Sequence, residues 1–329
     1  MKKALAILLA VMMIAGLCAC GSSGGEKPPA EPSKSDKTYH IGICQLVQHV
    51  ALDAATQGFK DALTEKLGAD AVTFDYQDAS GDSANCSVIV NGFVSDKVDL
   101  IMCNATAPLQ AAAAATSEIP ILGTSVTDYA SALDIADWSG TVGGNISGTS
   151  DLAPLDQQAA MLKELFPDAK TVGLLYCSAE PNSVYQCTVI EGHLKELGYD
   201  VQWFAFTDTN DVASVTQDAC DKADVLYIPT DNTAASNTEA IANVVIPAKV
   251  PVIAGEEGIC AGCGVATLSI NYYDLGYATG EMAAEILGSG ADISTMPVAY
   301  APLVTKEYNT ANCEALGVTV PSDYVAIGG

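Results

Sequence analysis

The feature that most constrains the fold is a pattern of secondary structure that occurs twice along the chain. Residues 41–43 and 172–174 each place a glycine between two β-branched or aliphatic residues, and a loop, a helical pattern and a second apolar run follow each. Both copies then pass through an Asp-rich turn and a helix into a Lys-x-Asp sequence and another apolar strand. The economical explanation is two copies of one α/β unit, with parallel sheets covered by helices on both faces.

The pattern predicts each element by its residue range. Strands are expected at 39–46, 71–76, 100–103, 120–124, 171–176, 200–205, 225–228, 251–254 and 266–270. Helices are expected at 52–67, 84–95, 107–116, 156–165, 183–197, 212–219, 236–244 and 273–287. In doubly wound sheets the loops that follow the strands collect along one edge, where such folds bind ligands. Those loops are therefore the expected location of function.

The N-terminus carries the pattern of a signal peptide. Lys2 and Lys3 precede an apolar run over 4–17 that is shorter than the roughly 20 residues a membrane span needs. Leu17-Cys18-Ala19-Cys20 resembles the bacterial lipobox, which predicts cleavage before Cys20 and a lipid on its thiol; an ordinary secreted protein cleaved nearby is the alternative. Residues 1–20 are thus the expected signal peptide. Residues 21–37, rich in Gly, Ser, Pro and charge, are the expected flexible tether.

The charge of the chain limits its partners. It has 40 acidic and 14 basic residues, a formal net charge of −26, so nucleic acid and anionic lipid surfaces are poor partners. Every basic residue is lysine, and the sequence contains no arginine. An anionic group on a ligand must therefore meet hydroxyls, backbone N–H groups or helix N-termini. A phosphorylated ligand is disfavoured, whereas a carboxylate balanced by its own ammonium group is easily accommodated.

Cysteine and histidine patterns give little support to catalysis or metal binding. Cys44, Cys103 and Cys177 fall in or beside strand-like runs, which favours buried thiols. Cys260 and Cys263 form an isolated CxxC sequence. It is compatible with a surface disulfide or with two free thiols, and metal binding is the third alternative. The three histidines lack HExxH spacing, and no GxSxG, Walker or GxGxxG motif occurs. No cofactor, no metal and no enzymatic activity are expected.

Several polar residues in the loops after strands have chemistry suited to a ligand. Thr106 and Asp231 are predicted to cap helices, which would leave backbone donors and a partial positive charge at the cleft. Glu180 and Glu256 are available for an ammonium group, and the predicted loops also carry short polar side chains. Tyr185 and Tyr272 offer aromatic faces, although a tyrosine on a helix is more often part of the core.

The chain resembles the ABC-transporter substrate-binding lipoproteins that include tryptophan- and tyrosine-binding proteins. The resemblance runs from about residue 41 to 320. In the first half it rests on Ile41-Gly42-Ile43-x-Gln45, His49-x-Ala51-Leu52-Asp53, Gly58-Phe59, the sequence over 94–101, Thr124-x-Val126-Thr127-Asp128 and the sequence over 143–151. In the second half it rests on Asn182-Ser183-Val184-Tyr185-Gln186, Pro229-Thr230-Asp231-Asn232-Thr233 and Tyr272-Tyr273-Asp274-Leu275-Gly276.

This resemblance implies a type I periplasmic-binding fold, with two doubly wound lobes joined by three crossover strands near 144–150, 270–272 and 297–303. Lobe 1 would comprise 38–146 and 273–296, and lobe 2 would comprise 147–272 and 297–329. The residues expected to line the ligand cleft are Gln45, His49, Thr106, Thr127, Glu180, Asn182, Ser183, Tyr185, Asp231, Asn232, Glu256 and Asn271. Val50 stands where the family commonly has proline, and Glu256 and Asn271 stand where aspartate is common. The identity of the solute is therefore not inferred from the family.

The resulting hypothesis is an extracytoplasmic, lipid-anchored solute-binding component of an ABC importer, held at the outer face of the cytoplasmic membrane. Its expected partners are a small zwitterionic solute, for which the hypothesis names an aromatic amino acid, and a membrane permease. Alternatives within the binding class are a nucleoside, a branched-chain amino acid or a role in ligand sensing. An anchored α/β hydrolase or deaminase is the alternative from another class, and it would require an aligned acid, base or metal site in the cleft.

Overall fold

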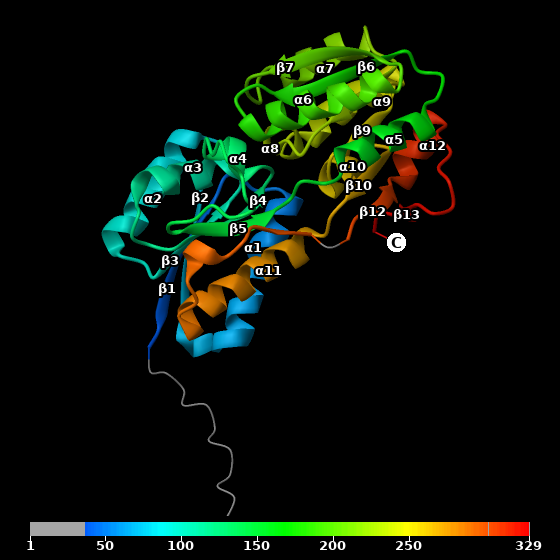
Figure 1. Ribbon diagram of the computed structural model, residues 1–329. Helices are drawn as coiled ribbons and strands as arrows, with labels where there is room; N and C mark the ends of the chain where they lie inside the picture. Colours follow the sequence, from blue (N-terminus) through cyan, green and yellow to red (C-terminus); the bar gives the residue numbers. More distant parts are fainter. Residues whose placement is uncertain (1–36, 302, 329) are drawn as a thin grey trace, which may run out of the picture. The chain divides into compact units, whose positions relative to one another are not determined.

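The computed structural model describes residues 37–301 and 303–328. The predicted signal peptide, the lipidation at Cys20 and the tether up to residue 36 lie outside the described residues. Two mostly parallel sheets, each with helices on both faces, form the two predicted lobes (Figure 1). We call the six-stranded sheet with its packed helices lobe 1, and the seven-stranded sheet with its packed helices lobe 2.

The strands of lobe 1 are β1 (Tyr39–Gln45), β2 (Val72–Asp78), β3 (Leu100–Asn104), β4 (Ile121–Val126), β5 (Ile146–Ser150) and β11 (Ala299–Tyr300). The strands of lobe 2 are β6 (Thr171–Cys177), β7 (Asp200–Phe206), β8 (Val225–Ile228), β9 (Val252–Ala254), β10 (Ala266–Ser269), β12 (Thr305–Tyr308) and β13 (Val325–Ala326). Their spatial orders are β11-β5-β4-β3-β1-β2 and β13-β12-β10-β9-β8-β6-β7. The first five strands of each lobe follow the same order, which confirms the predicted duplication.

The helices also lie close to their predicted ranges. They are α1 (Val50–Leu67), α2 (Ser83–Asp96), α3 (Thr106–Ala115), α4 (Tyr129–Ala132), α5 (Leu155–Leu165), α6 (Pro181–Glu196), α7 (Val212–Cys220), α8 (Asn232–Ala235), α9 (Thr238–Ala248), α10 (Glu257–Gly262), α11 (Tyr272–Ala284) and α12 (Thr310–Leu316). The single helix predicted over 236–244 is instead preceded by the separate turn α8. Asp231 begins that turn by accepting a hydrogen bond from the Ala234 N–H at 2.8 Å, which confirms its predicted capping role.

The predicted cap at Thr106 is wrong. Thr106 is the first residue of α3, and Ala105 occupies the cap position without any side-chain hydrogen bond. Ala105 adopts a φ of 104°, a conformation that is strained for a residue with a Cβ. Helix α3 therefore begins with no side-chain cap, and its first backbone N–H groups have no partner within the helix.

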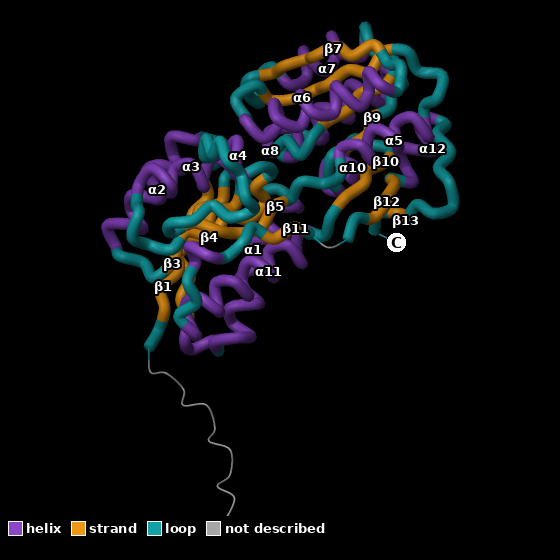
Figure 2. The backbone as a smooth tube through the Cα atoms, in the orientation of Figure 1, coloured by secondary structure: helices purple, strands orange, loops and turns teal. Residues whose placement is uncertain are grey.

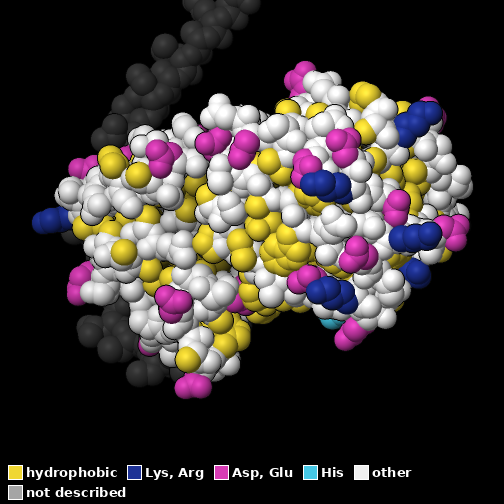
Figure 3. All heavy atoms as spheres, turned by 90° about the horizontal axis from the view of Figure 1, so that it is seen from above, with side chains coloured by type: hydrophobic (Ala, Val, Ile, Leu, Met, Phe, Trp, Pro, Cys, Tyr) yellow, Lys and Arg dark blue, Asp and Glu magenta, His cyan; other side chains and the backbone are white. Residues whose placement is uncertain are grey.

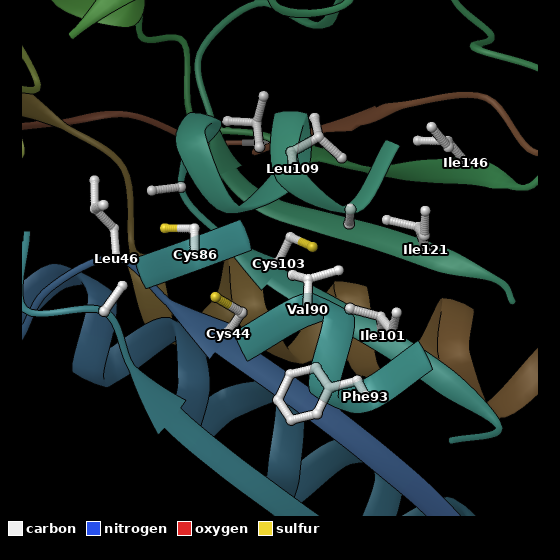
Figure 4. Packing of buried hydrophobic residues seen from close by; sticks show 14 of the residues in the cluster. Cys44, Leu46, Cys86, Val90, Phe93, Ile101, Cys103, Leu109, Ile121 and Ile146 are labelled. Atoms are coloured by element: carbon white, nitrogen blue, oxygen red, sulfur yellow. The ribbon is translucent and has the colours of Figure 1, made fainter. Parts of the chain in front are cut away.

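The core of lobe 1 follows the alternation of its central strands. Ile41 and Ile43 of β1 pack toward α1 and α11, and Cys44 points to the opposite face with α2 and α3. Figure 4 shows Cys44 with Cys86 of α2 and Cys103 of β3, all fully buried and unbonded. The prediction of buried thiols at Cys44 and Cys103 is confirmed, because these side chains fill apolar space between the sheet and α2.

The core of lobe 2 contains the CxxC sequence. Cys260 and Cys263 are both fully buried beside α9, and each is a free thiol. The surface disulfide that the sequence left open is not formed in this structure, and the thiols serve as small apolar side chains. Cys177 is likewise buried and free, as predicted.

Three segments connect the lobes (Figure 2). The chain leaves lobe 1 after β5, returns between β10 and α11, and leaves again between β11 and β12. Strand β11 pairs with β5 in parallel, and β12 pairs with β10 in antiparallel orientation. The predicted lobe boundaries stay a prediction, but these connections join the lobes beside the carboxyl ends of β5 and β10.

Glycines allow α1 and α11 to pack closely, which fixes two loops at the same edge of lobe 1. A Cβ on Gly276 would collide with the backbone carbonyl of Ala55, and one on Gly58 would collide with the backbone of Tyr273. His49 is the residue before α1, and Tyr272 is the first residue of α11. The backbone contact therefore determines how these two side chains lie relative to one another.

We predict that Gly276→Ala destabilises the protein by about 1–3 kcal/mol, because the new methyl group meets backbone atoms that cannot rotate away. Gly192→Ala is the matched control, since Gly192 lies in α6 with no atom within 4 Å of an added Cβ. That control should be neutral or stabilising by up to about 1 kcal/mol. Urea unfolding measures both, and equal effects of the two substitutions would contradict the close packing of α1 on α11.

Candidate functional site

A cavity lies where the carboxyl ends of the two sheets face each other. Its interior offers about 10 Å³ to the centre of a water molecule, roughly the room that one water needs. The lining residues follow strands or begin the next helix, as expected for doubly wound sheets. They are His49, Leu52, Ser125 and Thr127 of lobe 1, Asp151 and Tyr272 at the connections, and Asn182, Thr230, Asp231, Asn232, Ala235 and Glu256 of lobe 2.

Three buried carboxyl groups line this cavity. Asp151 accepts hydrogen bonds from the Thr127 hydroxyl at 3.1 Å and the Tyr272 hydroxyl at 3.0 Å. Asp231 accepts from the backbone N–H groups of Cys177 and Ala234, and Glu256 accepts from those of Gly258 and Ile259. Asp231 also has a hydrogen bond with the Ser183 side chain. Because each carboxyl oxygen has two lone pairs, all three groups can still accept further hydrogen bonds.

Burial disfavours the ionised forms of these groups. Burial raises the pKa of Asp151 to about 6 and that of Glu256 to about 7. The pKa of Asp231 is also raised, first by burial and then by the nearby charge of Glu180. No lysine is among the cavity-lining residues, so within the described chain these carboxyls face each other without a cation. An ammonium group placed among them would restore the favourable ionised state.

Glu180 organises the opposite wall rather than lining the cavity. Its carboxylate accepts hydrogen bonds from the backbone N–H groups of Asn232 and Thr233, from the Thr233 hydroxyl and from the Asn232 side-chain amide. The Asn232 amide is thereby oriented with its Nδ2 toward Glu180 and its Oδ1 toward His49 at 3.1 Å. Because Oδ1 only accepts, His49 Nε2 must carry the proton of this bond.

The other ring nitrogen of His49 follows from this bond. Burial lowers the pKa of His49, so the neutral ring predominates near pH 7. A neutral ring that is protonated at Nε2 has a bare lone pair at Nδ1. This atom is buried and has no hydrogen-bond partner among residues 37–301 and 303–328.

Ser125 is a second unpartnered group at the cavity. The residue is 6% exposed, and its Oγ has no hydrogen-bond partner in the described part of the chain. Its φ of 53° places it in the left-handed region, which is strained for serine and is often retained at binding sites. Strand β4 pairs with β3, so Ser125 lies next to the uncapped start of α3.

Two hydrogen bonds cross between the lobes at this site. One joins His49 to Asn232, and the other runs from the Gln186 side-chain amide to the Thr127 hydroxyl at 3.3 Å. Both involve residues from strand-end loops or helix starts. The lobes therefore meet through the groups that line or adjoin the cavity.

Six of the predicted ligand residues line the cavity, and six do not. His49, Thr127, Asn182, Asp231, Asn232 and Glu256 are brought together there, whereas Gln45, Thr106, Glu180, Ser183, Tyr185 and Asn271 are not among its lining residues. The predicted roles of all twelve in ligand binding stay predictions.

The residues outside the cavity lining mostly have other hydrogen-bond partners. Gln45 is buried, where it accepts from the Thr56 hydroxyl and donates to Asp53, and Asn271 is exposed and caps α11. Ser183 is fully buried behind Asn182, which donates to its hydroxyl. Tyr185 is half-buried on α6, and Thr106 is buried at the start of α3.

The sequence prediction omitted Leu52, Ser125, Asp151, Thr230 and Ala235, and it offered Tyr272 only as an aromatic face. Asp151 and Thr230 do lie in segments that carry the family resemblance, so a systematic search of strand ends could have included them. Ser125 directly follows the predicted strand over 120–124 and could have been included in the same way, although the sequence does not reveal its left-handed backbone.

The described residues were compared with the geometry of metal sites and of membrane-spanning helices. Among 37–301 and 303–328 no group of three His, Cys, Asp or Glu side chains is arranged to hold a metal ion. None of the helices in the same part of the chain combines the length and apolar character that a membrane span requires. On the face in Figure 3, acidic side chains are spread among the few lysines.

Comparison with known proteins identifies several similar chains. The "Tyrosine-binding protein" of Clostridioides difficile (strain R20291) is 37% identical over 302 residues, which cover 90% of this chain and 87% of the relative. A crystal structure of an ABC domain from Streptococcus pneumonia in complex with L-Trp is 31% identical, with a TM-score of 0.83, and the match covers 87% of this chain and 97% of that one.

A third similar structure is the ligand-free, open structure of a substrate-binding protein with adhesive properties from Clostridium difficile. It is 38% identical and covers 88% of this chain and 99% of its own, yet its TM-score is 0.67. The present structure is therefore more similar to the L-Trp complex than to the open structure, although its sequence is less similar.

The family model for ABC transporter substrate binding proteins matches residues 40–327, which span both lobes and every residue of the cavity. Together with the matching two-sheet architecture and the similarity to these relatives, this shows that the chain belongs to the ABC transporter substrate binding protein family.

Proposed function

We propose that this protein is the solute-binding component of an ABC importer, and that it holds an aromatic amino acid between its two lobes. The choice of a zwitterion rests on one observation. The cavity combines buried carboxyl groups with the unpartnered hydroxyl of Ser125, which lies beside the uncapped start of α3. Similarity to proteins described with tyrosine and L-Trp supports an aromatic side chain.

The amino group of the ligand would lie among the buried carboxyls. Asp151, Asp231 and Glu256 each retain acceptor capacity, and ionised carboxylates form the stronger, charge-assisted hydrogen bonds with ammonium groups. Binding of the ammonium would offset the burial that now raises the pKa of these groups.

The carboxylate of the ligand would lie on the lobe 1 side. Ser125 offers a hydroxyl, and the start of α3 offers backbone N–H groups and the positive end of a ten-residue helix dipole. This arrangement replaces the guanidinium that many carboxylate sites use, and the sequence contains no arginine. Thr106 would contribute through its backbone.

The aromatic ring would be enclosed by lobe closure. The cavity in this structure accommodates about one water molecule, so a solute with a ring requires the lobes to separate and close again around it. Leu52 from lobe 1 and Ala235 from lobe 2 are apolar lining residues on opposite sides, and Tyr272 adds an aromatic side chain between the lobes. The hydrogen bonds from His49 and Gln186 across the lobes would then stabilise the closed arrangement.

Members of this family bind a small solute and deliver it to a membrane permease outside the cytoplasm. We propose the same partners here, with hydrolysis of ATP performed by a separate subunit. Anchoring through a lipid on Cys20 is part of this proposal and rests on the lipobox-like sequence alone. The protein itself would perform no chemistry on its ligand.

Thermal unfolding of the protein without residues 1–36 should identify the solute class. We predict that tyrosine, tryptophan or phenylalanine raises the melting temperature, because a ligand at 100 times its Kd adds about 2.7 kcal/mol to stability. Leucine and a nucleoside serve as the comparison ligands. A shift with leucine or the nucleoside and none with any aromatic amino acid would contradict the proposed ligand and indicate one of the alternatives.

Affinity for the aromatic amino acid should increase with pH between about 5 and 8. The ammonium favours ionised carboxyls, but the pKa values of Asp151 and Glu256 are raised to about 6 and about 7. As pH falls through this range the free protein binds protons at these groups, and binding of the ammonium must then release them, which lowers the affinity. Each released proton changes affinity by up to about tenfold per pH unit. Other titratable groups lie close to these carboxyls: Glu180 is near Asp231 and His49, and Glu257 is near Glu256.

Isothermal titration calorimetry in buffers of different ionisation enthalpy measures this proton release directly. An observed binding enthalpy that varies with the buffer at pH 6–7 agrees with the account. Affinity that is constant from pH 5 to 8, with no dependence on the buffer, would show that the carboxyls do not meet the ammonium.

A further inference from the structure

We propose that the amino group is the part of the ligand that this cavity cannot do without, so that arylalkyl amines lacking a carboxylate form a second class of ligands. This inference rests on the proposed function, because it concerns the same cavity. It goes further in stating which half of the zwitterion controls recognition and in extending the ligands to amines such as tyramine and tryptamine.

The first step is a count of the hydrogen-bonding groups that remain available at the cavity. Most donors are already engaged: the Thr127 and Tyr272 hydroxyls donate to Asp151, and the Asn182 amide donates to Glu180 and to the Thr230 carbonyl. The Asn232 amide donates to Glu180 as well. Among the described lining side chains, two hydroxyls remain available to donate: that of Ser125, whose oxygen has no partner, and that of Thr230, which accepts from the Gln186 amide.

Acceptors, in contrast, remain in excess. The three carboxyl groups have two or three donors each from the protein and can accept further hydrogen bonds. His49 adds a neutral acceptor, because the bond from Glu180 through Asn232 places the ring proton on Nε2 and leaves the Nδ1 lone pair unpartnered. An ammonium group, with three N–H donors and no acceptor, complements this set.

The second step compares the two halves of the ligand. A ligand that keeps the carboxylate but lacks the amine brings a further negative charge to a cavity lined by Asp151, Asp231 and Glu256 and by no lysine among the described residues. A ligand that keeps the amine but lacks the carboxylate leaves the Ser125 hydroxyl unpaired, and a water molecule can occupy that position. Loss of the amine should therefore weaken binding more than loss of the carboxylate.

The test uses three ligands that share one ring: tyrosine, tyramine and 3-(4-hydroxyphenyl)propionate, measured by calorimetry at pH 8. We expect tyramine to bind within roughly 100-fold of tyrosine, which corresponds to the loss of one or two hydrogen bonds to a charged group. The propionate should bind more weakly than tyramine or not measurably. Binding of the propionate that equals or exceeds that of tyramine, or failure of tyramine to bind while tyrosine binds, would overturn the inference.

Variants of His49 test the lone pair separately from the contact between lobes. His49→Leu removes both Nδ1 and the bond to Asn232. It should lower the affinities for tyrosine and for tyramine by similar factors, roughly 10- to 100-fold. His49→Asn loses the bond to Asn232 but keeps an acceptor near the position of Nδ1, so it should restore a substantial part of both affinities. If His49→Asn is as weak as His49→Leu, the acceptor is not what His49 contributes.

Ser125→Ala provides the matched comparison on the donor side. It should weaken tyrosine more than tyramine, because only tyrosine carries the carboxylate that meets this hydroxyl. An equal loss of affinity for the two ligands would contradict the placement of the ligand carboxylate beside Ser125 and of the ammonium among the carboxyl groups. Circular dichroism and thermal unfolding of each variant establish that it folds before its affinities are compared.

The outcomes separate this inference from the proposed function. Binding of tyrosine without tyramine leaves the proposed function standing and rejects the amine class. Binding of tyramine or tryptamine without any aromatic amino acid rejects the zwitterion and retains the amine class. If all three tyrosine analogues fail to bind, and the tryptophan series fails as well, both proposals are rejected.

Discussion

The burial of three carboxyl groups around a cavity that no lysine of the described chain lines is the constraint on which the rest of the site depends. Burying charge without a partner is costly, and proteins reduce this cost by hydrogen bonding and by protonation. Here backbone N–H groups at helix starts support Asp231 and Glu256, and two hydroxyls support Asp151. A positive group that enters from outside would relieve the remaining cost without protonation, and under the proposed function this would couple ligand binding to the stability of the cavity.

The scaffold places these groups by packing rather than by flexible loops. Helices α1 and α11 approach through glycine, which positions His49 and Tyr272 on lobe 1. Glu180, at the start of α6, holds α8 by its backbone and side chains and so orients Asn232 toward His49. The contact between the lobes at His49, the tautomer of this histidine and its acceptor character toward the cavity thus follow from one connected set of hydrogen bonds.

The sequence was sufficient for the fold because its strongest signal, the repeated order of strands and helices, is a property of many residues at once. It also named several residues that line the cavity, since Asp231, Asn232 and Glu256 follow strands of a doubly wound sheet. It did not single out Ser125 among the residues after the strands, because neither its left-handed backbone nor the missing partner of its hydroxyl is visible in the sequence. Nor could it separate Glu180, which binds protein N–H groups, from Asp151, which faces the cavity, because both are acidic residues in loops.

A crystal structure of the protein with the aromatic amino acid that binds it would test the central claim most directly. The account predicts the ligand's ammonium nitrogen within hydrogen-bond distance of Asp151, Asp231 or Glu256 and of His49 Nδ1, with its carboxylate beside Ser125 and the start of α3. A ligand bound in the reverse orientation, with its carboxylate among the three carboxyl groups, or bound outside the space between the lobes, would contradict it.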